Sequence, residues 1–85
     1  MNREEILAIV LKNLRLNVES VPAGDIDTSK SMAAYGAGSL DIVEIVSASM
    51  RELRIRVPRT QLAGLKNIDD LVDLFLRMKS GVAAT

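Results

Sequence analysis

Apolar residues recur every three or four positions near the start of the chain, which is the spacing of an amphipathic helix. On a wheel of 3.6 residues per turn, one face is formed by Ile6, Leu7, Val10, Leu11 and Leu14. The neighbouring charged residues Glu4, Glu5, Lys12 and Arg15 lie off that face. The pattern predicts a helix over about residues 3–16.

A second periodic stretch opens at Ser39 and runs to about Arg54. Its predicted buried face consists of Ile42, Val43, Val46, Met50 and Leu53. The extended segment 55–57 then ends at Pro58, which is followed by a short predicted helix over 59–63, closed by Gly64.

The last helix is predicted to begin after Asn67, whose side chain is a suitable N-cap. Two aspartates occupy its first turn and two cations its last, as the helix dipole favours. Its buried face consists of Ile68, Leu71, Val72, Phe75 and Met78.

Residues 17–38 show no periodicity and contain proline, glycines and other turn-forming residues. A loop of this length in a small domain usually has a function. We expect it to be attached to the core through Val21, Ile26, Met32 and Tyr35. The fold class is therefore all-α: four helices, a long loop between the first and second, and a short third helix. We expect a single domain over 1–85, ordered from about 3 to 79, with a flexible tail over 80–85.

Composition excludes several classes of function. The 85 residues include no His and no Cys, which rules out Ser-His-Asp and Cys-His catalysis and zinc sites built on these ligands. Eleven basic and eleven acidic residues give zero formal net charge, which does not favour a nucleic acid partner. The longest apolar run is too short to span a membrane, and the N-terminal residues do not resemble a signal peptide. We expect a soluble, cytoplasmic domain.

Most candidate chemistry lies in residues 36–41, Tyr35 being followed by Gly-Ala-Gly-Ser-Leu-Asp. Ser39 stands at a predicted helix start, where a phosphate ester would lie beside free backbone N–H groups. The alternative is that Ser39 only caps the helix. A nucleophile elbow needs Gly where Ala37 and Asp41 stand, and the dinucleotide and Walker glycine patterns are also absent.

These residues resemble the acyl carrier protein family, in which a Gly-x-Asp-Ser-Leu element opens the second of four helices. The stretch 36–46, Val57-Pro58 and the last helix all match, so the resemblance covers about residues 3–79. It implies that Ser39, alone among the seven serines, carries phosphopantetheine, which a separate phosphopantetheinyl transferase installs from coenzyme A. The arm supplies a thiol that a chain without Cys lacks. An acyl chain would lie between the second and third helices, against Val43, Val46, Val57 and Leu62.

Two departures from the family concern partner binding. Gly38 replaces the usual Asp before the serine, and residues 51–59 contain four arginines against the single Glu52. We call these arginines the basic cluster: Arg51, Arg54, Arg56 and Arg59. The cluster is either a solvated surface or a device that selects dedicated acyltransferases and synthases and repels housekeeping partners. Acidic contacts remain at Asp41 and Glu44, with Leu40 and Ile45 expected as exposed apolar contacts beside them.

Residues 59–68 are similar to discrete carriers of polyketide pathways that bring acetyl groups to β-branching enzymes related to hydroxymethylglutaryl synthase. This resemblance implies a carrier of acyl thioesters in polyketide or fatty acid biosynthesis, not an enzyme, and we expect it to be a monomer. An excised domain of a larger synthase would have the same sequence features as a discrete carrier. A peptidyl or D-alanyl carrier and a helical interaction module without a prosthetic group are the alternatives.

Overall fold

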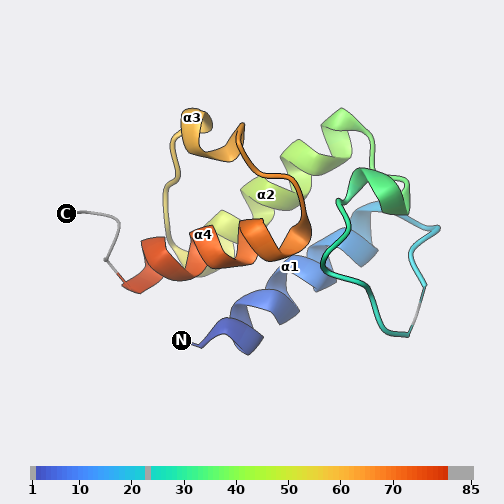
Figure 1. Ribbon diagram of the computed structural model, residues 1–85, viewed down its shortest axis with the longest axis horizontal. Coiled ribbons are helices and arrows are strands. Elements are labelled where there is room, and N and C mark those ends of the chain that lie inside the picture. The colour runs from blue at the N-terminus through green and yellow to red at the C-terminus, as the bar shows by residue number, and fades with distance from the viewer. Residues whose placement is uncertain (1, 23, 81–85) are drawn as a thin grey trace.

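The computed structural model describes residues 2–22 and 24–80, and within these ranges the regular structure is entirely helical (Figure 1). The helices are α1 (Arg3–Asn17), α2 (Ser39–Leu53), α3 (Arg59–Leu62) and α4 (Ile68–Ser80). The long loop contains one 3-10 turn, η1 (Ala33–Tyr35). The all-α prediction is confirmed, and each predicted helix is present within one residue of its expected bounds. The predicted flexible tail falls on residues outside the described ranges, except for Ser80, which belongs to α4.

Local hydrogen bonds explain where the helices begin. At α1, the Asn2 side chain accepts the backbone N–H of Glu5 at 2.9 Å, and the Glu5 carboxylate accepts the N–H of Asn2 at 3.2 Å. At α4, the Asn67 side chain accepts the N–H of Asp70 at 2.7 Å, which confirms the predicted N-cap. The predicted role of Gly64 is wrong. Helix α3 ends one residue earlier than expected, and right-handed Ala63 follows it, so no left-handed glycine is needed.

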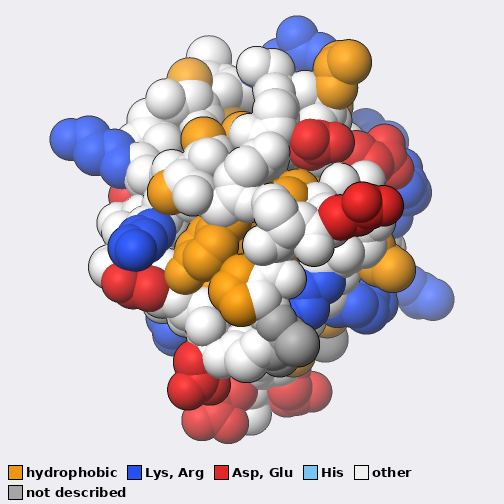
Figure 2. Space-filling view, turned by 90° about the vertical axis from the view of Figure 1, so that its right-hand side faces the viewer, with side chains coloured by type: hydrophobic (Ala, Val, Ile, Leu, Met, Phe, Trp, Pro, Cys, Tyr) orange, Lys and Arg blue, Asp and Glu red, His pale blue; other side chains and the backbone are white. Residues whose placement is uncertain are grey.

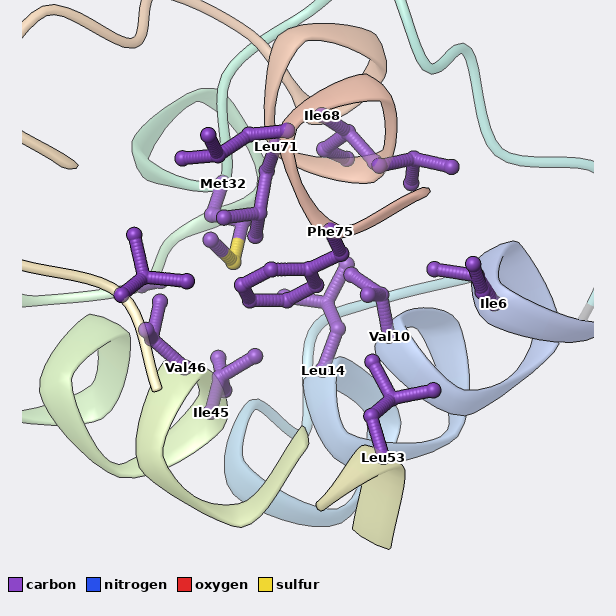
Figure 3. Packing of buried hydrophobic residues seen from close by; sticks show 14 of the residues in the cluster. Ile6, Val10, Leu14, Met32, Ile45, Val46, Leu53, Ile68, Leu71 and Phe75 are labelled. Atoms are coloured by element: carbon purple, nitrogen blue, oxygen red, sulfur yellow. The ribbon is translucent and has the colours of Figure 1, made fainter. Parts of the chain in front are cut away.

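The three long helices enclose a core centred on Phe75, which is fully buried (Figure 3). Figure 3 shows its ring among side chains from α1, α2 and the long loop, with Leu71 of its own helix beside it. Of the four residues expected to attach the loop, Met32 is buried, whereas Val21, Ile26 and Tyr35 are half-buried and packed against the core. The loop is therefore part of the packed structure.

The buried face of α2 differs from the prediction at three positions: Val43, Ile45 and Ser49. Ile45 is fully buried, whereas Val43 is 60% exposed. The reason is that α1 packs against this helix and extends the buried arc to Ile45 and Ser49, away from Val43. Ile45 is consequently a core residue, and the expectation that it is an exposed partner contact is wrong.

A polar network joins α1 to α2 beneath the surface. The buried Asn13 side-chain amide donates to Ser49 Oγ at 3.3 Å and to Glu52 Oε2 at 2.9 Å. Ser49 Oγ in turn donates to the carbonyl oxygen of Ile45 at 2.7 Å, and Glu52 also pairs with Lys12. Because buried polar groups are costly when unpaired, this network fixes one register of the two helices.

The long loop is also tied to α4 through its backbone. The N–H groups of Ile68 and Asp69 donate to the carbonyl oxygens of Lys30 and Thr28, at 3.1 and 2.9 Å. Backbone N–H groups in the first turn of a helix have no acceptor within that helix. Here the loop supplies carbonyl acceptors for two of them. The loop that leads to Ser39 is thus held in place by the start of α4.

Candidate functional site

Ser39 is the first residue of α2, and its side chain is exposed. The N-cap is Gly38, which precedes it in extended conformation at φ −82° and ψ 175°. The Asp41 carboxylate accepts the N–H of Gly38 at 2.9 Å, so this acid stabilises the helix start. The interpretation of Ser39 as a simple N-cap is therefore wrong, because it stands one position inside the helix.

The turn before Ser39 depends on one glycine. Gly36 has φ 99°, and a Cβ atom at this position would lie 2.8 Å from Ser20 Oγ. Gly38 is different, since a Cβ there would have its nearest neighbour at 3.6 Å, in ordinary contact. The backbone therefore accepts a side chain where the carrier family usually has Asp, and glycine at this position is not required by the turn.

Apolar side chains lie exposed beside Ser39. Leu40 is 85% exposed, as the sequence predicted for a contact residue. Val43 was not predicted to be exposed, yet it lies one turn from Ser39 on the open side of α2. The second exposed apolar side chain near Ser39 is therefore Val43, and not Ile45 as expected.

An apolar groove of about 650 Å³ runs between α2 and α3. The four residues expected to contact an acyl chain, Val43, Val46, Val57 and Leu62, all line this groove. The remaining lining residues are Ile42, Ser47, Met50, Arg59 and Ala63. A second cavity has a volume of about 130 Å³ and shares two lining residues with the groove, Ile42 and Val46.

Charges of opposite sign occupy the two ends of α2. Asp41 and Glu44 stand near Ser39, whereas the basic cluster is exposed from the end of α2 to the start of α3. Glu44 pairs with Arg51 at 3.6 Å along the exposed face. At the end of the molecule formed by the long loop, acidic and basic side chains also alternate, without a field of a single sign (Figure 2).

Glu52, the single acid within the segment of the basic cluster, pairs with residues of α1 and not with these arginines. Hydrogen bonds from Lys12 and Asn13 lower the pKa of its carboxyl group below the ordinary value. In the described part of the chain, the ion pairs within 4.0 Å include Arg51 and no other member of the basic cluster. Three of the arginines therefore offer their guanidinium groups to solvent or to a partner.

The described residues hold no group of three or more potential metal ligands. No helix within those residues is long and apolar enough to cross a membrane. The features that suit a prosthetic arm are the exposed hydroxyl at the first position of α2, the exposed apolar side chains next to it and the groove that follows. These residues fit a flexible group whose phosphate lies at the helix start and whose acyl end is apolar.

Comparison with known proteins decides the family. The family model for the phosphopantetheine attachment site matches residues 4–75. The chain belongs to the acyl carrier protein family. Its members are carriers that hold a covalently attached phosphopantetheine group and are not enzymes. The predicted family, carrier function and prosthetic group are confirmed.

Individual relatives cover most of the chain. The polyketide biosynthesis acyl-carrier-protein AcpK of Bacillus subtilis (strain 168) is 24% identical over 74 residues, 87% of this chain and 90% of its own. The acyl carrier protein of Campylobacter jejuni (strain RM1221) is 28% identical over 76 residues, 89% of this chain and 94% of its own. A solved complex of the curacin pathway HMG synthase with its acetyl donor carrier matches with TM-score 0.78 and 33% identity, covering 88% of this chain and 96% of that one.

Proposed function

We propose that Ser39 carries the phosphopantetheine group. The observation that supports this most directly is the exposed hydroxyl in the first position of α2, which does not cap the helix because Gly38 occupies the N-cap position. A phosphate ester on Ser39 Oγ lies beside the backbone N–H groups and the positive dipole end of a 15-residue helix. The attached group supplies the thiol for a thioester, which the chain itself lacks because it has no Cys.

The residues around Ser39 then have distinct roles. The groove between α2 and α3 holds the acyl end out of water, with Val43, Val46, Val57 and Leu62 as its apolar contacts. The partner surface comprises Leu40, Val43, Asp41, Glu44 and the basic cluster. We assign these residues to docking with the phosphopantetheinyl transferase, acyltransferases and synthases. One carrier domain over residues 1–85, a monomeric state and a cytoplasmic location stay predictions.

We further propose that the chain serves polyketide biosynthesis as an acetyl donor to an enzyme of the HMG synthase type. The support is the likeness to the curacin acetyl donor carrier, at 33% identity over most of both chains, together with the likeness to AcpK. The basic cluster is consistent with a dedicated partner, since charge of this sign disfavours enzymes with basic docking surfaces.

Intact-protein mass spectrometry tests the attachment site. The purified chain is incubated with coenzyme A and a phosphopantetheinyl transferase of broad specificity. We expect one phosphopantetheine mass addition on the wild type and on the control Ser47→Ala, and none on Ser39→Ala. All three should have the same circular dichroism spectrum. A mass addition that survives in Ser39→Ala would exclude Ser39 as the site.

Acetyl transfer tests the pathway. The acetyl-loaded chain and the acetyl-loaded Campylobacter jejuni carrier are each mixed with the curacin HMG synthase, and acetylation of the enzyme is followed by mass. We expect faster transfer from this chain. Equal or slower transfer would contradict the acetyl donor role and leave Ser39 loading unaffected. Loading by an amino-acid-activating enzyme in preference to acetyl groups would instead indicate a peptidyl or D-alanyl carrier.

A further inference from the structure

The turn that presents Ser39 contains two glycines and needs support from outside the turn. Gly36 and Gly38 both precede Ser39, and glycine restricts the backbone less than any other residue. On the inner side, Ala37 is buried and its N–H donates to the carbonyl oxygen of Met32 at 3.2 Å. The outer side of the turn is exposed, so its geometry depends on hydrogen bonds to other parts of the long loop.

Tyr35, four residues before Ser39, receives two such hydrogen bonds from the outer part of the loop, which lies beside η1 (Figure 1). Ser20 Oγ donates to the carbonyl oxygen of Tyr35 at 3.0 Å. The backbone N–H of Asp27 donates to the hydroxyl oxygen of Tyr35 at 2.6 Å. The bonded residues are 15 and 8 positions apart in the sequence, so both bonds are separate from the local bonds of the 3-10 turn. Tyr35 therefore connects the outer loop to the turn that ends at Ser39.

Gly36 makes the first of these contacts possible. A Cβ atom at this position would lie 2.8 Å from Ser20 Oγ, so a side chain here would displace Ser20. The carbonyl group that Ser20 holds belongs to Tyr35, directly before the left-handed glycine at φ 99°. The glycine that turns the chain thus also admits the hydroxyl that fixes the turn.

We propose that Tyr35 and Ser20 are positioning residues for the modification of Ser39, holding the exposed turn in the geometry in which a transferase reaches Ser39 Oγ. This inference rests on attachment at Ser39. In that step, Ser39 Oγ forms a bond to the coenzyme A phosphorus next to the pantetheine. The bond from this phosphorus to the leaving adenosine bisphosphate breaks, and the hydroxyl proton passes to a base on the transferase. The attacking oxygen must be aligned with the leaving oxygen, and a misplacement of about 1 Å can cost about 100-fold in rate.

Transferase kinetics test the inference. Tyr35→Phe removes only the hydroxyl that accepts the Asp27 N–H, and Ser20→Ala removes only the donor to the Tyr35 carbonyl. The kinetics are measured with coenzyme A and a phosphopantetheinyl transferase of broad specificity. We expect kcat of each variant to fall about fivefold, the change in population that one hydrogen bond of ordinary net strength controls. The KM for the carrier should stay the same, because the exposed contacts Leu40 and Glu44 are unaltered.

Two controls separate positioning from a general loosening of the protein. Ser29→Ala removes a hydroxyl that bonds to the Asp27 carboxylate in the same loop and makes no contact with the turn. Ile6→Val weakens the core from α1, where Ile6 is fully buried. Both controls should load with the kcat of the wild type.

NMR relaxation of the backbone amides gives a second measurement that does not depend on the transferase. The Gly38 and Ser39 amides should show more fast motion in Tyr35→Phe and Ser20→Ala than in the wild type and the two controls. Unchanged kcat in either variant, an equal loss in a control, or a change confined to KM would overturn the inference. Absence of any mass addition on the wild type would instead refute attachment at Ser39, so the two failures are distinguishable.

Discussion

Replacing Phe75 by alanine is expected to remove most of the stability of the fold. Phe75 is fully buried, with 0% of its surface accessible to water. Its ring lies among side chains from α1, α2 and the loop (Figure 3). Truncation of a buried Phe to Ala costs about 3–5 kcal/mol. A domain of this size has a free energy of unfolding of roughly 3–5 kcal/mol in total. Phe75→Ala should therefore be largely unfolded at 25 °C.

A graded variant keeps the effect measurable. Phe75→Leu fills part of the space and should cost about 1–2 kcal/mol. Urea unfolding is followed by far-ultraviolet circular dichroism. With a slope near 1 kcal/mol per M for a small protein, its midpoint should fall by about 1–2 M. The control is Leu16→Ala on the exposed face of α1, where the side chain is 74% exposed, and its midpoint should hardly move. A Phe75→Ala protein that unfolds at the same midpoint as Leu16→Ala would refute the packing of α4 described above.

Three further predictions concern charge and polarity. Changing all four residues of the basic cluster to Glu should leave helicity and Ser39 loading unchanged. Acyl transfer to a dedicated partner should weaken in a salt-sensitive way, and transfer to fatty acid synthase enzymes should improve. Transfer rates that are equal for wild type and variant, at low and at high salt, would make the cluster a solvated surface. Asn13→Ala should destabilise the fold by about 1–3 kcal/mol in urea titrations, because Ser49 loses its buried donor; an unchanged midpoint would contradict this. The pKa of Glu52 is lowered in the folded state, so its stabilisation is present above the ordinary carboxyl pKa and is lost as pH falls. Glu52→Gln should accordingly lose less melting temperature than wild type between about pH 5 and pH 3, and equal losses would contradict the assignment.

The helices were predictable because each long one has a regular apolar face. The predicted N-cap at Asn67 and the helix start at Ser39 also have local signals, a capping side chain in the first case and preceding glycines in the second. The groove residues followed from the carrier resemblance. Local sequence thus contained most of the information on where the elements begin and which faces are apolar.

Features that depend on packing between distant segments were not predictable. Ile45 and Val43 are both β-branched residues on one helix, and only the position of α1 decides which of them is buried. Asn13 and Ser49 are polar, so no apolar pattern indicates that they lie inside the structure. The hydrogen bonds that the N–H groups of α4 donate to the carbonyl oxygens of Thr28 and Lys30 join backbone atoms, which leave no side-chain signature in the sequence. The position of Arg59 in the groove likewise became visible only in the folded chain.

The anchoring of α4 at both ends has a consequence for motion. Its start is held by the carbonyl groups of Thr28 and Lys30, and near its end Lys79 Nζ donates to the carbonyl oxygen of Leu53 at 2.8 Å. The segment 54–67, which includes α3, therefore connects two anchored positions, Leu53 and the start of α4. Helix α3 itself contributes no fully buried residue. Val57 anchors the segment in the core, whereas the residues of α3 itself are half-buried or exposed. We therefore expect the amides of α3 to exchange with solvent faster than those of α2 and α4, through local opening. We expect such opening to make α3 a movable wall of the groove, so that cargo of different size can enter while the exposed face of α2 keeps its shape.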